Sequence, residues 1–226
     1  LVRLNQVIQA VREAYDRYNF MEVYRTIFNF LTNDLSAFYL DFAKDIVYIE
    51  TANSTERRRM QTVMYAILVK LTKLLVPIIP HTAEEIWTYL EQEEEAYAYL
   101  TEMPSAELIP DAAEMLDFWS AFLEFRTSVH KALEMARDEK VIGKSLEASV
   151  TVYPDEATRV LLASVAETEN VATLLIVSEF IVSHQAAPEN AVKVGDTALT
   201  VAHASGEVCQ RCRRIDETVG TNAHPH

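Results

Sequence analysis

Glycine is the residue that most limits the folds open to this chain. Its 226 residues contain four glycines, at positions 143, 195, 206 and 220, so none precedes position 143. β-Sandwiches and doubly wound phosphate-binding domains need glycine at tight turns and where the backbone approaches a ligand closely. Half of the residues are hydrophobic, which is enough to bury a substantial core. Residues 1–142 are therefore expected to be helical.

Apolar residues recur at helical spacing through this glycine-free part. The longest pattern covers residues 20–43, and Asn53 with Glu56 resembles a capping box that opens a further helix. Pro77 and Pro80 end that helix. The other helices are expected over residues 1–18, over 82–90 and from about 111 to 139. Each carries one apolar stripe, so the helices must pack on one another as a bundle.

The pattern changes after Gly143. Residues 148–153 alternate like a strand, 155–166 look helical, and 173–182 are apolar and β-rich. Two short β-rich runs flank Gly195-Asp196, which is a hairpin signal. The predicted fold is mostly α: a helical bundle, then a small βαββ module and a zinc-knuckle tail. The predicted domains are 1–142, 143–208 and 209–226.

The two cysteines, Cys209 and Cys212, form a C-x-x-C pair. Two cysteines are too few for a disulfide framework, and the pair supplies half of the usual four zinc ligands. His224 and His226 follow in the tail, and two free thiols in a reducing cytosol are the alternative. We expect the segment from about Cys209 onward to be poorly ordered or metal-free.

The net charge of −14 is unevenly distributed. Residues 74–125 contain twelve acidic and no basic residues, whereas residues 1–73 contain ten basic and eight acidic ones. A polyanion could not lie along the acidic segment, but it could lie along residues 1–73. No long apolar run is free of charges, so no membrane span is expected.

Two basic clusters are candidates for nucleic-acid binding. Arg57, Arg58 and Arg59 open one helix, and Arg59 shares a sector of roughly 60° with Lys70 and Lys73. This stripe fits either a phosphate backbone or a solvated helix face, and we expect it to lie away from the acidic surface of 84–117. The second cluster lies beside the cysteines. The complete set of candidate RNA-binding residues is Lys44, Arg57, Arg58, Arg59, Lys70, Lys73, Lys144, Arg211, Arg213 and Arg214.

Catalytic patterns are missing from the sequence. Gly143-Lys144-Ser145 is not a phosphate-binding P-loop, because Asp138 stands where that motif needs glycine. The six histidines have no spacing typical of a catalytic triad or a metalloprotease helix. Gly143 is instead expected to cap the preceding helix.

Several runs resemble a known family. They are Phe38-Tyr39-Leu40-Asp41, Lys44-Asp45 with Tyr48, Arg57-Arg58, Gln61-Thr62-Val63 and the run from Pro77 to Trp87. Together they resemble the anticodon-binding helical domain of class I aminoacyl-tRNA synthetases. The run at 35–45 is similar to the bacterial isoleucyl branch, and valyl enzymes are similar at 80–87 but diverge at 35–45. The segment from Arg126 to Val150 also resembles the isoleucyl branch, and Cys209-x-x-Cys212 resembles the first half of its C-terminal zinc module.

The resemblance implies an RNA partner, and it implies that catalysis takes place in another part of the enzyme. The partner would be an isoleucine tRNA, held by a cytoplasmic and monomeric ligase that binds zinc and uses ATP and magnesium. The family's His-Ile-Gly-His and Lys-Met-Ser-Lys-Ser motifs do not occur here, so residues 1–226 alone are expected to be a C-terminal part without catalytic activity. The alternatives are the same region of a valyl or leucyl enzyme, or a helical protein-interaction module with a zinc tail.

Overall fold

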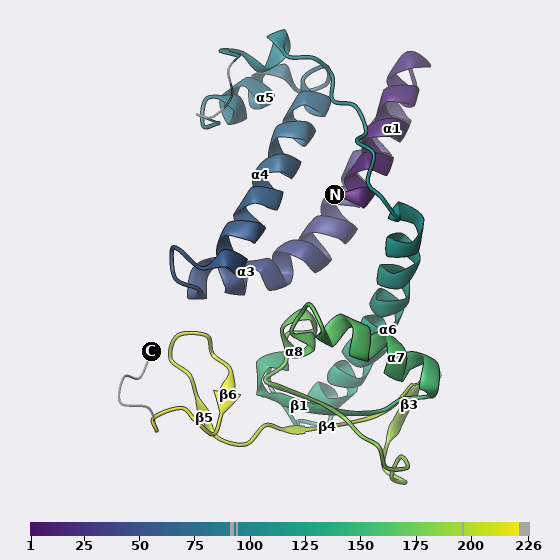
Figure 1. Ribbon diagram of the computed structural model, residues 1–226, viewed down its shortest axis with the longest axis vertical. Coiled ribbons are helices and arrows are strands. Elements are labelled where there is room, and N and C mark those ends of the chain that lie inside the picture. The colour runs from purple at the N-terminus through teal and green to yellow at the C-terminus, as the bar shows by residue number, and fades with distance from the viewer. Residues whose placement is uncertain (91–92, 94, 196, 222–226) are drawn as a thin grey trace. The chain divides into compact units, whose positions relative to one another are not determined.

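The structure is a computed structural model that describes residues 1–90, 93, 95–195 and 197–221. The chain packs as two compact units, Leu1–Ala112 and Ala113–His226 (Figure 1). Within the described residues, no helix is long and apolar enough to cross a membrane. The predicted fold class is confirmed, because helices dominate the first unit and a small mixed sheet lies in the second.

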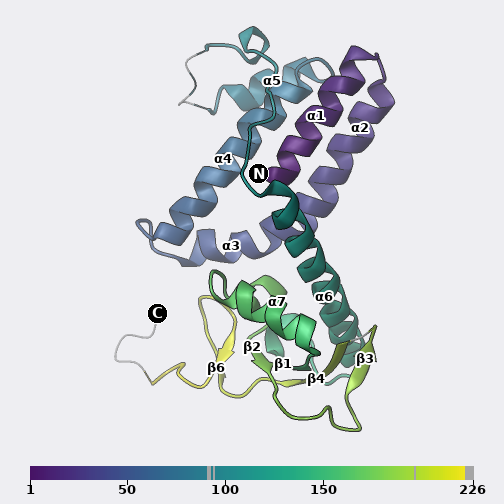
Figure 2. The same ribbon diagram turned by 45° about the vertical axis from the view of Figure 1, so that its right-hand side comes forward.

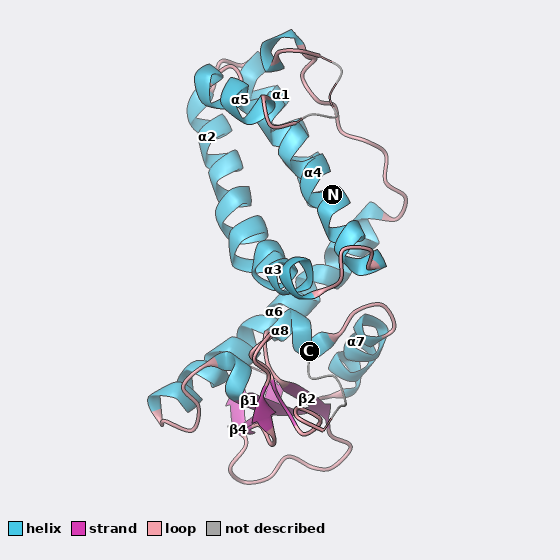
Figure 3. Ribbon diagram, turned by 90° about the vertical axis from the view of Figure 1, so that its left-hand side faces the viewer, coloured by secondary structure: helices cyan, strands magenta, loops and turns pink. Residues whose placement is uncertain are grey.

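The first unit contains helices but no strand over its described residues. Its elements in chain order are α1 (Val2–Asp16), α2 (Phe20–Asn29), a π-helix (Phe30–Tyr39), α3 (Leu40–Ile49), α4 (Thr55–Leu75), α5 (Pro80–Trp87) and a short 3₁₀ turn (Ala98–Leu100). The expected helix over 20–43 is in fact one helical path from Phe20 to Ile49 that widens into π geometry in the middle. Figure 3 shows α2 and α4 as long helices of this unit.

Caps explain where two of these helices begin. The Asn19 side chain accepts a hydrogen bond from the backbone N–H of Glu22, at 3.2 Å, and so opens α2. Ser54 does the same for the N–H of Arg57, at 3.4 Å, and opens α4. The cap is therefore Ser54 and not the expected Asn53, whose side-chain oxygen accepts from Arg58 instead.

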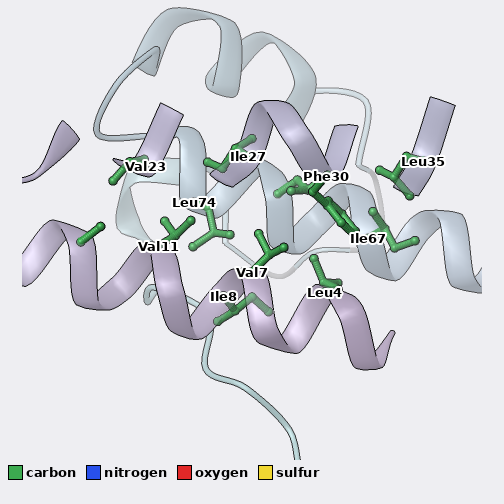
Figure 4. Close-up of a cluster of buried hydrophobic side chains, with 12 residues drawn as sticks. Leu4, Val7, Ile8, Val11, Val23, Ile27, Phe30, Leu35, Ile67 and Leu74 are labelled. Atoms are coloured by element: carbon green, nitrogen blue, oxygen red, sulfur yellow. The ribbon is translucent and has the colours of Figure 1, made fainter. Parts of the chain in front are cut away.

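One apolar cluster holds the first unit together. Figure 4 shows α1, α2, the π-helix and α4 each contributing side chains to it. Its fully buried members include Leu4, Val11 and Leu74, and the Tyr15 hydroxyl donates to the carbonyl of Leu74 at 2.8 Å. A smaller cluster of Trp87, Leu90 and Ala98 closes the α5 end.

The second unit packs a long helix on a four-stranded sheet. Its elements are α6 (Ala112–Asp138), a 3₁₀ turn (Ser145–Glu147), β1 (Ala148–Tyr153), α7 (Glu156–Ala166), α8 (Val171–Leu175), β2 (Glu179–Val182), β3 (Val192–Val194) and β4 (Thr197–His203). The sheet order is β2-β1-β4-β3, with β1 parallel to β2 and the other pairs antiparallel. The hairpin predicted at Gly195 is confirmed, because β3 pairs antiparallel with β4. The predicted βαββ order is incomplete: the module runs β1, α7, α8, β2, β3, β4, and the first half of the β-rich run 173–182 belongs to helix α8.

Helix α6 belongs with the sheet. The sequence-based division placed it in 1–142 with the preceding helices, but its buried face contacts the second unit. Phe125 meets Phe180 edge-on with ring centroids 6.1 Å apart, and the guanidinium of Arg126 donates to the carbonyl of Leu174 at 3.1 Å. The apolar stripe of α6 therefore covers the sheet, and α6 groups with residues 113–226.

A two-stranded hairpin follows the sheet. β5 (Glu207–Val208) pairs antiparallel with β6 (Ile215–Asp216), and the C-x-x-C pair lies in the turn between them. Gly206 has φ +116°, and an added Cβ there would lie 2.4 Å from the backbone carbon of Asp216. Only glycine fits this close approach of two backbones. Residues 209–216 form the turn and second strand of this hairpin, while 222–226 lie outside the described residues. That the segment from Cys209 onward is poorly ordered or metal-free stays a prediction.

Candidate nucleic-acid interface

The start of α4 carries three consecutive arginines beside the α3–α4 connection, at one end of the first unit (Figure 2). Arg57 Nη1 donates to the carbonyl of Glu50 at 3.2 Å, which satisfies a group at the C-terminal end of α3. Arg58 Nη2 donates to Asn53 Oδ1 at 2.8 Å, and Arg58 and Arg59 are exposed. Each guanidinium has several N–H donors, so a single bond orients Arg58 and leaves donors for a phosphate or base.

An exposed tyrosine lies at the same end of the unit. Tyr48, in the last turn of α3, is 81 % exposed. Lys44 is one turn earlier and is bonded to Asp41 at 2.7 Å, a hydrogen bond that raises the pKa of the lysine. Aromatic side chains in such positions stack on unpaired bases. Sequence reasoning did not select Tyr48 as a site residue, although it stands outside the buried face of α3 marked by Phe42 and Ala43.

Lys70 and Lys73 face acidic partners. Lys70 Nζ pairs with Glu107, and Lys73 Nζ lies 4.0 Å from Glu93 and 5.4 Å from the centroid of Trp87. Their side chains are only 19 % and 21 % exposed. The expectation that these lysines lie away from the acidic segment 84–117 is therefore wrong. The segment after α5 folds back along α4 and brings its carboxylates to both lysines.

The acidic segment has structural contacts of its own. The Glu84 carboxylate accepts the backbone N–H groups of Ala98 and Tyr99, at 3.1 and 2.8 Å. The indole of Trp87 donates to the carbonyl of Glu95 at 2.8 Å. These bonds close the loop after α5. They concentrate negative charge at the end of the unit opposite the α3–α4 connection, about 30 Å away along α4.

The C-x-x-C turn places two thiols three residues apart in the chain, between β5 and β6. The thiol of Cys209 is buried and lies 3.5 Å from the backbone N of Cys212, which donates to it. This and neighbouring backbone N–H groups lower the pKa of Cys209, whereas burial raises the pKa of Cys212. In the part of the chain that the structure describes, no third histidine, cysteine or carboxylate completes a metal-binding group. His224 and His226 lie outside that part. The thiols thus fit two positions of a tetrahedral zinc site.

The basic residues near this turn differ in role. Arg214 Nη2 donates to Thr173 Oγ1 at 2.8 Å and ties the hairpin to α8. Arg211 and Arg213 are exposed, and Arg213 has φ +66° and donates to Gln210 at 3.2 Å. These two side chains are better placed to meet a ligand than Arg214.

The backbone N–H groups of the loop around Lys144 are hydrogen-bonded within the loop. The Glu147 carboxylate accepts the backbone N–H of Gly143 at 2.6 Å and of Lys144 at 3.2 Å, and these bonds lower the pKa of Glu147. A phosphate cradle would need the same N–H groups, so the rejection of a P-loop at 143–145 is consistent with this geometry. The exposed Lys144 side chain stays a candidate.

Comparison with known proteins decides the family. A family model described as the anticodon-binding domain of tRNA ligase matches residues 1–152. The chain belongs to this family. This anticodon-binding chain is 61 % identical over 229 residues to the isoleucine–tRNA ligase of Lactococcus lactis subsp. lactis (strain IL1403). That match covers 100 % of this chain and 24 % of the relative.

Other similar proteins are also isoleucine–tRNA ligases. The isoleucine–tRNA ligase of Streptococcus sanguinis (strain SK36) is 58 % identical over 218 residues, which is 96 % of this chain and 23 % of the relative. The ligase of Streptococcus mutans serotype c (strain ATCC 700610 / UA159) is 55 % identical over 219 residues, which is 97 % of this chain and 23 % of the relative. The chain thus spans about a quarter of the length of the curated relatives it matches.

Proposed function

We propose that this chain binds the anticodon arm of an isoleucine tRNA as part of an isoleucine–tRNA ligase. The observation that carries the proposal is the match of residues 1–152 to the anticodon-binding family, together with 61 % identity to such a ligase along the whole chain. The whole ligase joins isoleucine to its tRNA with ATP and magnesium, as a monomer in the cytoplasm.

The α3–α4 end of the first unit is the surface we assign to the RNA. Arg58 and Arg59 contact phosphates there, and the ring of Tyr48 stacks on a base that is splayed out of the anticodon loop. Arg57 supports both, because its bond to the carbonyl of Glu50 holds the connection in shape. Lys44 lies one turn from Tyr48, but its charge is compensated by Asp41 at 2.7 Å, so it takes a smaller part in phosphate binding than Arg58 and Arg59.

The remaining candidates take smaller parts in this proposal. Lys70 and Lys73 are compensated by Glu107 and Glu93, so they orient the acidic segment and contribute little to phosphate binding. Lys144, Arg211 and Arg213 form a second contact region in the other unit. Cys209 and Cys212 hold zinc together with ligands outside the described residues, and the metal rigidifies the turn that carries the two arginines.

Catalysis is assigned to parts of the ligase outside residues 1–226. The chain has neither signature motif of the catalytic domain, so the purified chain should show no isoleucine-dependent exchange of pyrophosphate into ATP. Exchange above background by the chain alone would overturn this division of labour.

A salt series tests the RNA-binding part of the proposal. The dissociation constant of the chain for an isoleucine anticodon stem–loop is measured at several salt concentrations, beside the double variant Arg58→Gln, Arg59→Gln. The affinity should fall steeply with salt, and the variant should lower the slope by about 1 for each phosphate that it no longer neutralises. Lys73→Gln is the matched control: the charge of Lys73 is compensated by Glu93, so its removal should leave the affinity and the salt slope nearly unchanged. Affinity that does not depend on salt would favour the alternative of a protein-interaction module.

A further inference from the structure

The hairpin of β5 and β6 is too short to hold its own orientation. Each strand has two residues, and an isolated two-stranded hairpin is only marginally stable in water. The N–H of Cys209 donates to the carbonyl of Arg214 at 2.8 Å, and the N–H of Arg213 donates to the carbonyl of Cys209 at 2.9 Å. These bonds fix the shape of the turn. The placement of the turn against the sheet depends on contacts that the hairpin makes with other elements.

One serine side chain supplies such a contact. Ser178 lies between α8 and β2, and its half-buried Oγ accepts the backbone N–H of Ile215, the first residue of β6, at 2.8 Å. The same hydroxyl donates to the carbonyl of Leu146 in the 3₁₀ turn before β1. A hydroxyl has one donor and two acceptor positions, so it makes both bonds at once. Ser178 thereby joins two segments that are 32 and 37 residues away from it in the chain.

The two joined segments carry the basic residues of the second contact region. Lys144 stands two residues before Leu146, and Arg213 stands two residues before Ile215. Arg211 lies in the same turn as Arg213, and all three basic side chains are exposed. Binding that has to order a mobile segment loses affinity. A bond that holds both segments in one arrangement therefore favours any ligand that contacts the two together.

A second side-chain bond lies beside the first. Arg214 Nη2 donates to Thr173 Oγ1 at 2.8 Å, and Arg214 directly precedes Ile215. Both bonds hold the beginning of β6, and β5 is paired with β6. The strand pairs of the four-stranded sheet do not include either bond. Loss of one of these bonds should therefore loosen the turn and leave the sheet intact.

We propose that Ser178 is a positioning residue for RNA binding by the second unit. Its hydroxyl holds the Lys144 loop and the C-x-x-C turn in one arrangement, so that the basic side chains of both meet the phosphates of the RNA together. Ser178 acts through the backbone of Leu146 and Ile215 and does not itself contact the RNA. The inference rests on the proposed function, because that function assigns Lys144, Arg211 and Arg213 to the RNA.

A double-mutant cycle tests this role. The dissociation constant of the 226-residue chain for an isoleucine tRNA transcript is measured with and without Ser178→Ala, in the unaltered background and in the triple variant Lys144→Gln, Arg211→Gln, Arg213→Gln. In the unaltered background Ser178→Ala should weaken binding by about 2- to 13-fold, which is the net contribution of one hydrogen bond. In the triple variant the same substitution should change the affinity by less than about 2-fold, because the side chains that Ser178 positions are gone.

Three further variants separate positioning from a general loss of stability. Ser178→Thr keeps the hydroxyl and should restore most of the affinity. Ser149→Ala is the matched control, because it removes a hydroxyl that bonds Glu179 in the same sheet at 2.6 Å, and it should leave binding unchanged. Thr173→Val removes the acceptor of Arg214 and should weaken binding as Ser178→Ala does. Thr173→Val carries the test if Ser178→Ala does not fold.

Amide exchange reports on the same bond without RNA. The amide of Ile215 should exchange several-fold faster in Ser178→Ala, because its acceptor is lost, while the amides of β4 keep their rates. An unchanged rate at Ile215 would show that Ser178 does not hold the hairpin, and would overturn the proposal.

The binding data can overturn the proposal in two further ways. An equal loss of affinity in both backgrounds would make the role of Ser178 purely structural, and no loss in the unaltered background would leave Ser178 without a role in binding. Either result would reject the positioning role and keep the proposed function. Failure of the unaltered chain to bind the transcript would reject the proposed function and the positioning role together.

Discussion

Replacing Tyr48 by alanine separates base stacking from every structural role. The side chain is 81 % exposed, so its removal should change the free energy of unfolding by less than about 0.5 kcal/mol. Stacking of one base on an aromatic ring contributes about 1–3 kcal/mol to RNA binding. The dissociation constant for the isoleucine anticodon stem–loop should therefore rise by about 5-fold to about 150-fold.

Two variants complete this experiment. Tyr48→Phe keeps the ring and should bind nearly as well as the unaltered chain. Tyr89→Ala removes a tyrosine of similar exposure, 79 %, from the acidic end of the same unit and should leave binding unchanged. Binding is measured by fluorescence anisotropy, and folding by circular dichroism. Tyr48→Ala binding as tightly as the unaltered chain would refute the stacking role, and so would an equal loss with Tyr48→Phe.

Other substitutions separate structural side chains from those that contact RNA. Gly206→Ala should lower the melting temperature of the second unit by many degrees, because its Cβ would lie 2.4 Å from backbone, whereas Gly195→Ala meets nothing within 4 Å and should cost only about 1–2 kcal/mol. Lys73→Met should leave RNA affinity and its salt slope unchanged, while Arg58→Met should lower both in the same titration. The bonds that hold the pKa of Glu147 below its ordinary 4.5 stabilise the 143–147 loop above that pH, and this contribution is lost as the pH falls through the lowered pKa. The protection factor of the Gly143 amide, which corrects for the intrinsic pH dependence of exchange, should fall at that point, and a protection factor with no such step would count against the contact.

The sequence was informative where local chemistry decides the structure. The scarcity of glycine, the helical periodicity and the Gly195 turn sufficed to predict a helical first part and a hairpin in the second. These features depend on neighbours along the chain. The predicted N-cap of α4, Asn53, is one residue before the observed N-cap, Ser54. Both residue types are good caps, so the local sequence does not decide between them.

Long-range contacts account for what the sequence did not reveal. Lys70 and Glu107 are far apart in the chain, and their pairing depends on how the segment after α5 folds back. The packing of α6 also depends on a long-range contact. Its apolar stripe could cover either a helical bundle or a sheet, and only the contact between Phe125 and Phe180 shows that it covers the sheet. The π-helix from Phe30 to Tyr39 continues the helical pattern on both sides, so periodicity alone predicts an uninterrupted α-helix.

Recognition of the anticodon arm of an isoleucine tRNA is the role that we propose for this chain. The most direct test is its affinity for two stem–loops that are identical except for the three anticodon bases, one set reading isoleucine and the other not. We expect clearly tighter binding of the isoleucine stem–loop at physiological salt, with a discrimination of about 1–3 kcal/mol for each base that is read. Equal affinity for the two RNAs, or no binding of either, would contradict it.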